Sequence, residues 1–113
     1  MHELSLTQNL INISLQHADT QNIKRISLRL GLLSCVDGQA IKNCFETIAG
    51  QYQQLKNAQL SIIESKASAT CRECDAQFTV HTIGQSCECG SYNYELIGGD
   101  ELTLSSIECF ESA

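Results

Sequence analysis

Apolar residues recur at helical spacing in two stretches of the chain. Between Leu6 and Ala18 they are separated by three or four positions, and Ser5–Gln8 before them has the form of a capping box. This pattern predicts a first helix from about residue 6 to 18. A second stripe follows the i, i+3, i+4, i+7, i+8 rule and stops at Gly50, which predicts a second helix. Its members are Ile41, Cys44, Phe45, Ile48 and Ala49.

Three other stretches alternate between apolar and polar side chains and therefore predict strands with one buried face. They cover residues 26–32, 58–62 and 102–109. The last one changes phase between Leu104 and Ile107, which is typical of a bulge. Two helices and three strands predict an α+β domain in which a three-stranded sheet carries both helices on one face.

Four of the seven cysteines form two close pairs, and twelve residues separate the pairs. Cys71 and Cys74 have the usual two-residue spacing, whereas Cys87 and Cys89 enclose a single residue. Such pairs can converge on one tetrahedral ion, most commonly Zn²⁺ held by four thiolates. Because the second pair closes a tighter loop, His81 between the pairs stays an alternative ligand.

Two other interpretations of the pairs remain, a redox dithiol and unliganded thiols. A thioredoxin-like dithiol would stand at the start of a helix within a βαβ pattern. Residues 77–83 instead alternate like a strand. Zinc content after purification without added metal separates a zinc site from a redox site.

The cysteine pairs interrupt the region between the second and third predicted strands. At 113 residues the chain has room for one domain and a small appendage. We therefore expect residues 1–66 with 98–113 to form the α+β domain, and residues 67–97 to form an inserted zinc-knuckle, or rubredoxin-like, zinc domain. The polar run at 65–70 and the Gly98-Gly99 pair are the expected linkers.

Charge argues against nucleic acid as a partner. The chain carries a net charge of −6. Within the cysteine segment Arg72 is the only basic residue, and it stands among Glu73, Asp75, Glu88 and Glu95. Such a surface would repel phosphates.

The N-terminus has neither the basic region nor the continuous apolar region of a signal peptide, and no stretch is long and apolar enough for a membrane span. We therefore expect a cytoplasmic protein, and in that reducing compartment paired cysteines usually bind metal. The remaining Cys35, Cys44 and Cys109 are expected to be small buried hydrophobic residues.

A second metal-competent feature is the N-terminal Met1-His2-Glu3. The α-amine of Met1 and the Nδ1 of His2 form five- and six-membered chelate rings with the His2 backbone nitrogen, and the Glu3 backbone nitrogen competes with the amine. Deprotonated amide donors favour tetragonal Ni(II) or Cu(II) over Zn²⁺. On spacing alone, His2 as an ordinary N-terminal polar residue is the commoner interpretation.

Several motifs in order along the chain together resemble the HypA/HybF family of hydrogenase nickel-incorporation proteins. They are Met1-His2-Glu3-Leu4-Ser5-Leu6, Gly31-x-x-Ser34-Cys35-Val36-Asp37, the paired cysteines, Cys89-Gly90-Ser91, and Gly99-Asp100-Glu101-Leu102-x-x-x-Ser106-Ile107-Glu108. The resemblance covers essentially the whole chain.

The resemblance implies a metallochaperone that delivers Ni(II) to the large subunit of [NiFe]-hydrogenase, and in some bacteria to urease maturation proteins, with the GTPase HypB as partner. It implies nickel bound at Met1, His2 and Glu3 with Asp37 nearby. It also implies a structural zinc held by the four paired cysteines, here with the second pair shortened.

The chain shows no nucleophile–base pairing and no phosphate loop, so we expect no enzymatic activity. Two rival classes remain, a zinc-ribbon module for protein interaction and a redox-active thiol protein. The role of the zinc domain, purely structural or sensing nickel or pH, stays open.

Overall fold

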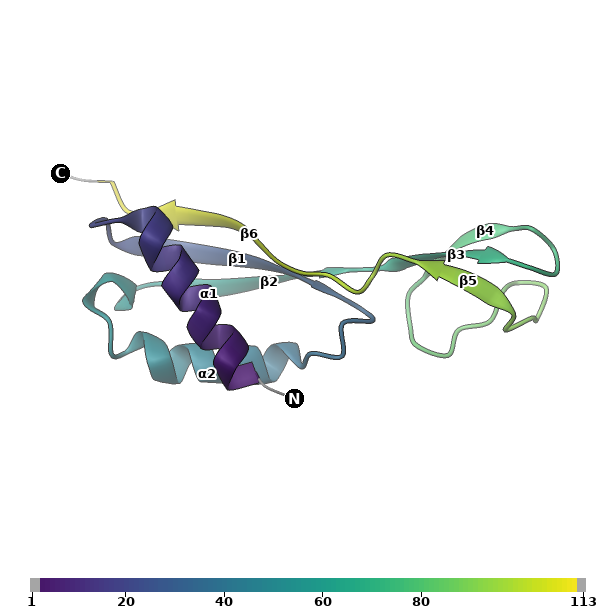
Figure 1. Cartoon of the computed structure of the whole chain (residues 1–113), viewed down its shortest axis with the longest axis horizontal. Coiled ribbons are helices and arrows are strands. Elements are labelled where there is room, and N and C mark those ends of the chain that lie inside the picture. The colour runs from purple at the N-terminus through teal and green to yellow at the C-terminus, as the bar shows by residue number, and fades with distance from the viewer. Residues whose placement is uncertain (1–2, 112–113) are drawn as a thin grey trace. The chain divides into compact units, whose positions relative to one another are not determined.

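The computed structural model describes residues 3–111 and contains two three-stranded sheets (Figure 1). The strand orders are β2-β1-β6 and β4-β3-β5. The elements in chain order are α1 (Glu3–Ala18), β1 (Ile23–Gly31), α2 (Gly38–Ala49), the short 3-10 helix η1 (Gln53–Leu55), β2 (Gln59–Ser65), β3 (Ala67–Cys71), β4 (Gln77–Val80), β5 (Tyr94–Ile97) and β6 (Leu102–Cys109). The predicted α+β fold, with its three-stranded sheet, two helices and an inserted cysteine-bearing part, is confirmed.

The described chain forms two compact units. The first consists of residues 3–28, 36–63 and 103–111, and the second of residues 29–35 and 64–102. The domain boundaries expected from the sequence, 66/67 and 97/98, stay a prediction. No helix of the described chain is long and apolar enough to cross a membrane.

The first unit has a core of eleven buried apolar side chains shared by both helices and the sheet. On β1, Ile26 and Leu28 point into this core, whereas Ser27 between them lies on the opposite face. On β6, Leu104 and Ile107 both pack against the core although they are three residues apart. The predicted change of phase along this strand is therefore confirmed.

The first helix begins one turn earlier than predicted. The sequence pattern placed its start near Leu6, with Ser5 as the cap, but α1 begins at Glu3 and includes Ser5. The extra turn is held by the Thr7 hydroxyl, which donates to the Glu3 carbonyl over 2.7 Å, and by a contact from Asp37 to the Glu3 carboxylate. The capping-box prediction is wrong because Ser5 lies inside the helix and not before its first turn.

The second unit has a very small core. Ala67, Ala69 and Val80 form its buried apolar cluster, and Ala67 lies opposite Val80 in the antiparallel β3–β4 pair. β5 pairs with the other edge of β3, also antiparallel, and places Tyr94 opposite Cys71. Three small side chains bury too little surface to hold a separate fold, so this unit needs another source of stability.

The expected linkers are bonded into the second unit. Residues 67–71 form β3, so the prediction of a linker over 65–70 is wrong. Gly31 N–H donates to the Glu101 carbonyl over 2.7 Å, and a β-carbon on Gly31 would stand 2.2 Å from the Gly99 carbonyl oxygen. Further backbone hydrogen bonds run from Leu32 to Ser65 and from Leu33 to Gly99. We call residues 31–33, 65 and 99–101 the junction.

Candidate metal centres

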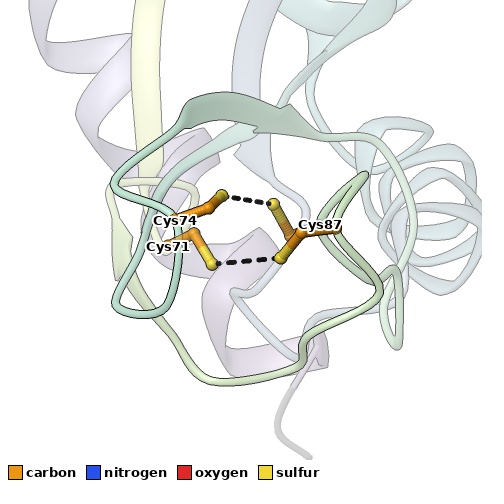
Figure 2. A group of neighbouring side chains, drawn as sticks. Cys71, Cys74 and Cys87 are labelled. Carbon is orange, nitrogen blue, oxygen red and sulfur yellow. Dashed lines mark hydrogen bonds between the residues drawn. The ribbon is translucent and has the colours of Figure 1, made fainter.

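Four cysteine sulfur atoms converge at one end of the second unit. Cys71 is the last residue of β3 and Cys74 lies in the loop after it, whereas Cys87 and Cys89 come from the loop before β5. Their sulfur atoms all lie within 4.8 Å of one another. The sulfur atoms of Cys71 and Cys89 are 3.7 Å apart, and those of Cys74 and Cys87 are 3.5 Å apart (Figure 2).

These separations fit a zinc ion. A tetrahedral zinc with Zn–S bonds of about 2.3 Å has sulfur atoms about 3.8 Å apart along each edge. Cys71 and Cys87 are buried, while Cys74 and Cys89 are exposed. Four thiol ligands with tetrahedral spacing leave no open coordination position, which is the pattern of a structural zinc site.

The first cysteine loop has a regular hydrogen-bonded form. Cys71 N–H donates to the Ala76 carbonyl over 2.8 Å, and Asp75 N–H donates back to the Cys71 carbonyl over 3.0 Å. Asp75 adopts a positive φ of 62°. The turn brings the sulfur atoms of Cys71 and Cys74 to the common site.

The second cysteine loop repeats the same bonds with one residue fewer. Cys87 N–H donates to the Ser91 carbonyl over 2.9 Å, and Gly90 N–H donates to the Cys87 carbonyl over 2.8 Å. Gly90 takes the positive φ, here 90°. The shortened Cys-x-Cys pair is thus accommodated inside the loop, and both of its sulfur atoms still reach the common site.

Backbone amides and neighbouring thiols set the charge of this site. The Cys74 amide, hydrogen-bonded to the Cys71 sulfur, lowers the pKa of Cys71 to about 7. The Ala76 amide acts in the same direction on Cys74, but the thiols of Cys87, Cys71 and Cys89 together with burial outweigh it and raise the pKa of Cys74 to about 12. Crowded thiols do not all ionise unless a cation compensates their charge. The amides and the crowding together favour a bound dication.

His81 is not part of this group. Within residues 3–111 the four cysteines are the one cluster of three or more His, Cys, Asp or Glu side chains able to hold a metal. His81 is exposed, and its backbone N–H donates to the Gln85 side chain over 2.8 Å. A role for His81 as an alternative zinc ligand stays a prediction.

The remaining cysteines differ in burial. Cys109 packs at the edge of the first unit's core, and Cys44 is half-buried. Cys35 is exposed and has a positive φ of 61°. The prediction of a buried hydrophobic role is therefore wrong for Cys35, whose polar loop neighbours Ser34 and Asp37 keep this turn at the surface.

The second candidate centre is the predicted nickel site at the N-terminus. Met1 and His2 lie outside the described residues. Glu3 and Asp37, which the sequence also singled out, lie together: Asp37 N–H approaches the Glu3 carboxylate oxygen Oε2 at 3.5 Å. Asp37 is also the N-cap of α2, and its Oδ1 accepts from Gln39 N–H over 3.0 Å. The starts of the two helices therefore meet here.

Thr7 is a residue of this site that the sequence did not reveal. Its side chain is fully buried, and its hydroxyl holds the Glu3 carbonyl. Glu3 is thus fixed at both its carbonyl and its carboxylate. Its own backbone N–H belongs to the first four of a helix, which have no intrahelical acceptor. That nitrogen remains free of the helical ladder, as a backbone metal donor requires.

Comparisons with known proteins point to one family. Residues 1–109 match the family model described as "Hydrogenase/urease nickel incorporation, metallochaperone, hypA". The chain is 39% identical to hydrogenase maturation factor HypA of Trichormus variabilis over 111 residues, covering 98% of this chain and 97% of that protein. The HypA of Nostoc punctiforme is 36% identical with the same coverage.

Solved structures agree with the sequence comparisons. The solution structure of the Ni metallochaperone HypA from Helicobacter pylori has a TM-score of 0.66 and 29% identity, and covers 99% of this chain and 100% of that one. A second solution structure of a HypA protein has a TM-score of 0.67 and 30% identity, with 97% of both chains covered.

Proposed function

Because the chain belongs to the HypA family of hydrogenase and urease nickel-incorporation metallochaperones, we propose that it binds Ni(II) at Met1-His2-Glu3 and delivers it during [NiFe]-hydrogenase maturation. The match over residues 1–109 carries the functional class. The anchoring of Glu3 by Asp37 and Thr7 supports the location of the nickel site.

The proposed nickel ligands are the Met1 amine, the His2 backbone nitrogen and Nδ1, and the Glu3 backbone nitrogen as an alternating donor. Adjacent five- and six-membered rings suit the tetragonal nitrogen geometry of Ni(II). We assign Asp37 a supporting role, because it meets Glu3 through its backbone N–H and uses its carboxylate to cap α2.

A structural zinc held by Cys71, Cys74, Cys87 and Cys89 completes the proposal. When bound, zinc supplies four strong bonds that link two loops. These bonds would stabilise the second unit, whose apolar core is very small. The protein's part is to present four preorganised sulfur atoms and the backbone amides that favour their ionised form.

A delivery protein must be able to release the Ni(II) that it binds. The nickel ligands must be deprotonated to bind, so a proton or an incoming ligand of the acceptor protein can displace them one at a time. We propose associative handover of nickel to the acceptor, with no covalent step and no catalytic activity in this chain.

The proposed partners are a HypB-type GTPase, the [NiFe]-hydrogenase large subunit and, for urease, its maturation proteins. We place the protein in the cytoplasm, without nucleic-acid partners or membrane insertion. The rival class, a zinc-ribbon interaction module without nickel delivery, predicts zinc binding but no nickel site at the N-terminus.

The test is Ni(II) calorimetry on the zinc-loaded protein with its native N-terminus and no tag, compared with His2→Ala. His17→Ala, at the exposed C-terminal end of α1, is the matched histidine control. We expect about one nickel per chain in the parent and the control, and no binding in His2→Ala with zinc content unchanged. Equal binding by all three proteins, or none by any, would leave only the zinc-ribbon interpretation.

A further inference from the structure

A groove of about 480 Å³ lies in the first unit between α2 and the start of β2. Its apolar lining comes from Phe45, Ala49, Leu55 and Leu60. Phe45 and Leu55 are almost fully buried and form a fixed floor. Neither candidate metal centre includes any of these residues, so the groove calls for its own explanation.

The strand beside the groove is an edge strand. In the order β2-β1-β6, β2 pairs with β1 on one side and with no other strand of the described chain on the other. Along such an edge alternate backbone N–H and C=O groups point outward and can pair with an added strand. β2 also exposes Ile63, which is 45% accessible. An extended peptide that adds to a sheet edge gains main-chain hydrogen bonds and places alternate side chains in pockets.

The charge of the groove is opposite to that of the molecule. The chain has thirteen acidic and seven basic residues, and two of the basic ones, Lys42 and Lys56, line this groove and are exposed. Glu46 is the acidic residue of the lining. The local balance is therefore positive on a protein whose net charge is −6. Exposed cations beside a docking edge select partners with carboxylates and steer their approach.

We propose that this groove binds an extended acidic segment of a partner protein, which adds to β2 as a strand. Apolar side chains of the segment would occupy the floor at Phe45 and Leu60, and its carboxylates would lie near Lys42 and Lys56. A second copy of this chain is a poorer occupant, because it would bring a groove that carries the same two lysines. The proposal rests on the first unit alone and does not depend on nickel binding.

The test uses the zinc-loaded full chain, labelled with ¹⁵N, and a synthetic nine-residue peptide that alternates glutamate and valine. We expect saturable shifts in the amide signals of residues 59–63 and 42–50. Two control peptides isolate the two sources of recognition: one replaces glutamate by lysine, and the other carries N-methyl groups on the backbone. We expect neither to bind, because the first reverses the charge and the second removes the strand's donors.

Substitutions in the protein test the same charge contacts. Two lost charge pairs are each worth up to about 1 kcal/mol, so Lys42→Glu with Lys56→Glu should weaken the peptide about tenfold or more. Lys24→Glu with Lys66→Glu changes the net charge equally and should retain binding.

The proposal would be overturned if the lysine peptide or the N-methylated peptide bound as tightly as the acidic one. It would also be overturned if the acidic peptide shifted no amide signals, or only signals outside residues 42–50 and 59–63. Shifts at residues 59–63 that depend only on protein concentration would assign the edge to a second copy instead, and would also overturn it.

Discussion

At the scale of single residues, the start of α1 shows how Glu3, its first residue, is held to the first unit. Thr7 lies inside the first unit and bonds to the carbonyl of Glu3, and Asp37, 34 positions away in the chain, bonds to its carboxylate. Glu3 thereby becomes the fixed base of the proposed nickel site. The first contact holds the Glu3 backbone and the second holds its side chain. Neither uses the Asp37 carboxylate, so substitution of that side chain separates capping of α2 from the contact with Glu3.

We expect Asp37→Ala to lower the free energy of unfolding by about 1 kcal/mol, because the α2 N-cap is lost. Asp37→Asn keeps both the cap and the backbone N–H that meets Glu3, so its stability and its nickel affinity should match the parent protein. Urea unfolding and nickel calorimetry check the two effects. A tenfold loss of nickel affinity in Asp37→Asn would instead make the carboxylate a ligand.

At the scale of elements, the junction replaces the linkers that the glycine and polar runs predicted. Gly31 lies there because two backbones approach too closely for a side chain, not because the chain must bend. A β-carbon on Gly31 would also stand 2.8 Å from the Glu101 backbone nitrogen. The end of β1 and the segment before β6 are therefore in direct backbone contact.

Gly31→Ala should lower the free energy of unfolding of the zinc-loaded protein by about 1–3 kcal/mol, the usual cost of overpacking. Gly50→Ala is the matched control, because Gly50 has a helical φ of −61° and its nearest neighbour atom would be 3.8 Å away. That change should be neutral or stabilise the fold by up to about 1 kcal/mol. Equal stabilities of the two variants in guanidinium would argue against a tight junction.

The sequence predicted those elements whose burial repeats with the period of a helix or strand. Both helices and the three strands of the first unit follow this rule. β3 escaped prediction because Ala67–Cys71 is small and polar, and its strand form depends on pairing with β4 and β5. The cysteines were recognisable because metal ligands in a loop are close in sequence. No local pattern signals the contact of Glu3 with Asp37, and only the family resemblance placed Asp37 near the predicted nickel site.

At the scale of the whole molecule, the two units differ in what holds them together. The first has eleven buried apolar residues in its core and the second has three. A structural zinc site contributes roughly 10–16 kcal/mol to the folding of a small metal-dependent unit. The second unit therefore depends on metal far more than the first.

Removal of zinc with a chelator should unfold the second unit and leave the first folded. Amide hydrogen exchange, followed by NMR with and without the chelator, is the direct measurement. We expect residues 67–97 to lose protection while α1, α2 and the first part of β1 keep theirs. Simultaneous loss of protection in both units would mean that they share one cooperative fold.

The shorter second cysteine loop has a consequence for how this chain can change its length. Removing one residue from within a strand reverses which side chains beyond that point face each side of the sheet. Here the bonds from Cys87 to Ser91 and from Gly90 to Cys87 close the shorter ring before β5 begins, so the alternation of Tyr94–Ile97 is untouched. A loop closed by these backbone hydrogen bonds can therefore absorb a change in its length. An insertion or deletion within this loop should stay local, whereas the same change inside β5 would reverse which side chains face each side of the sheet.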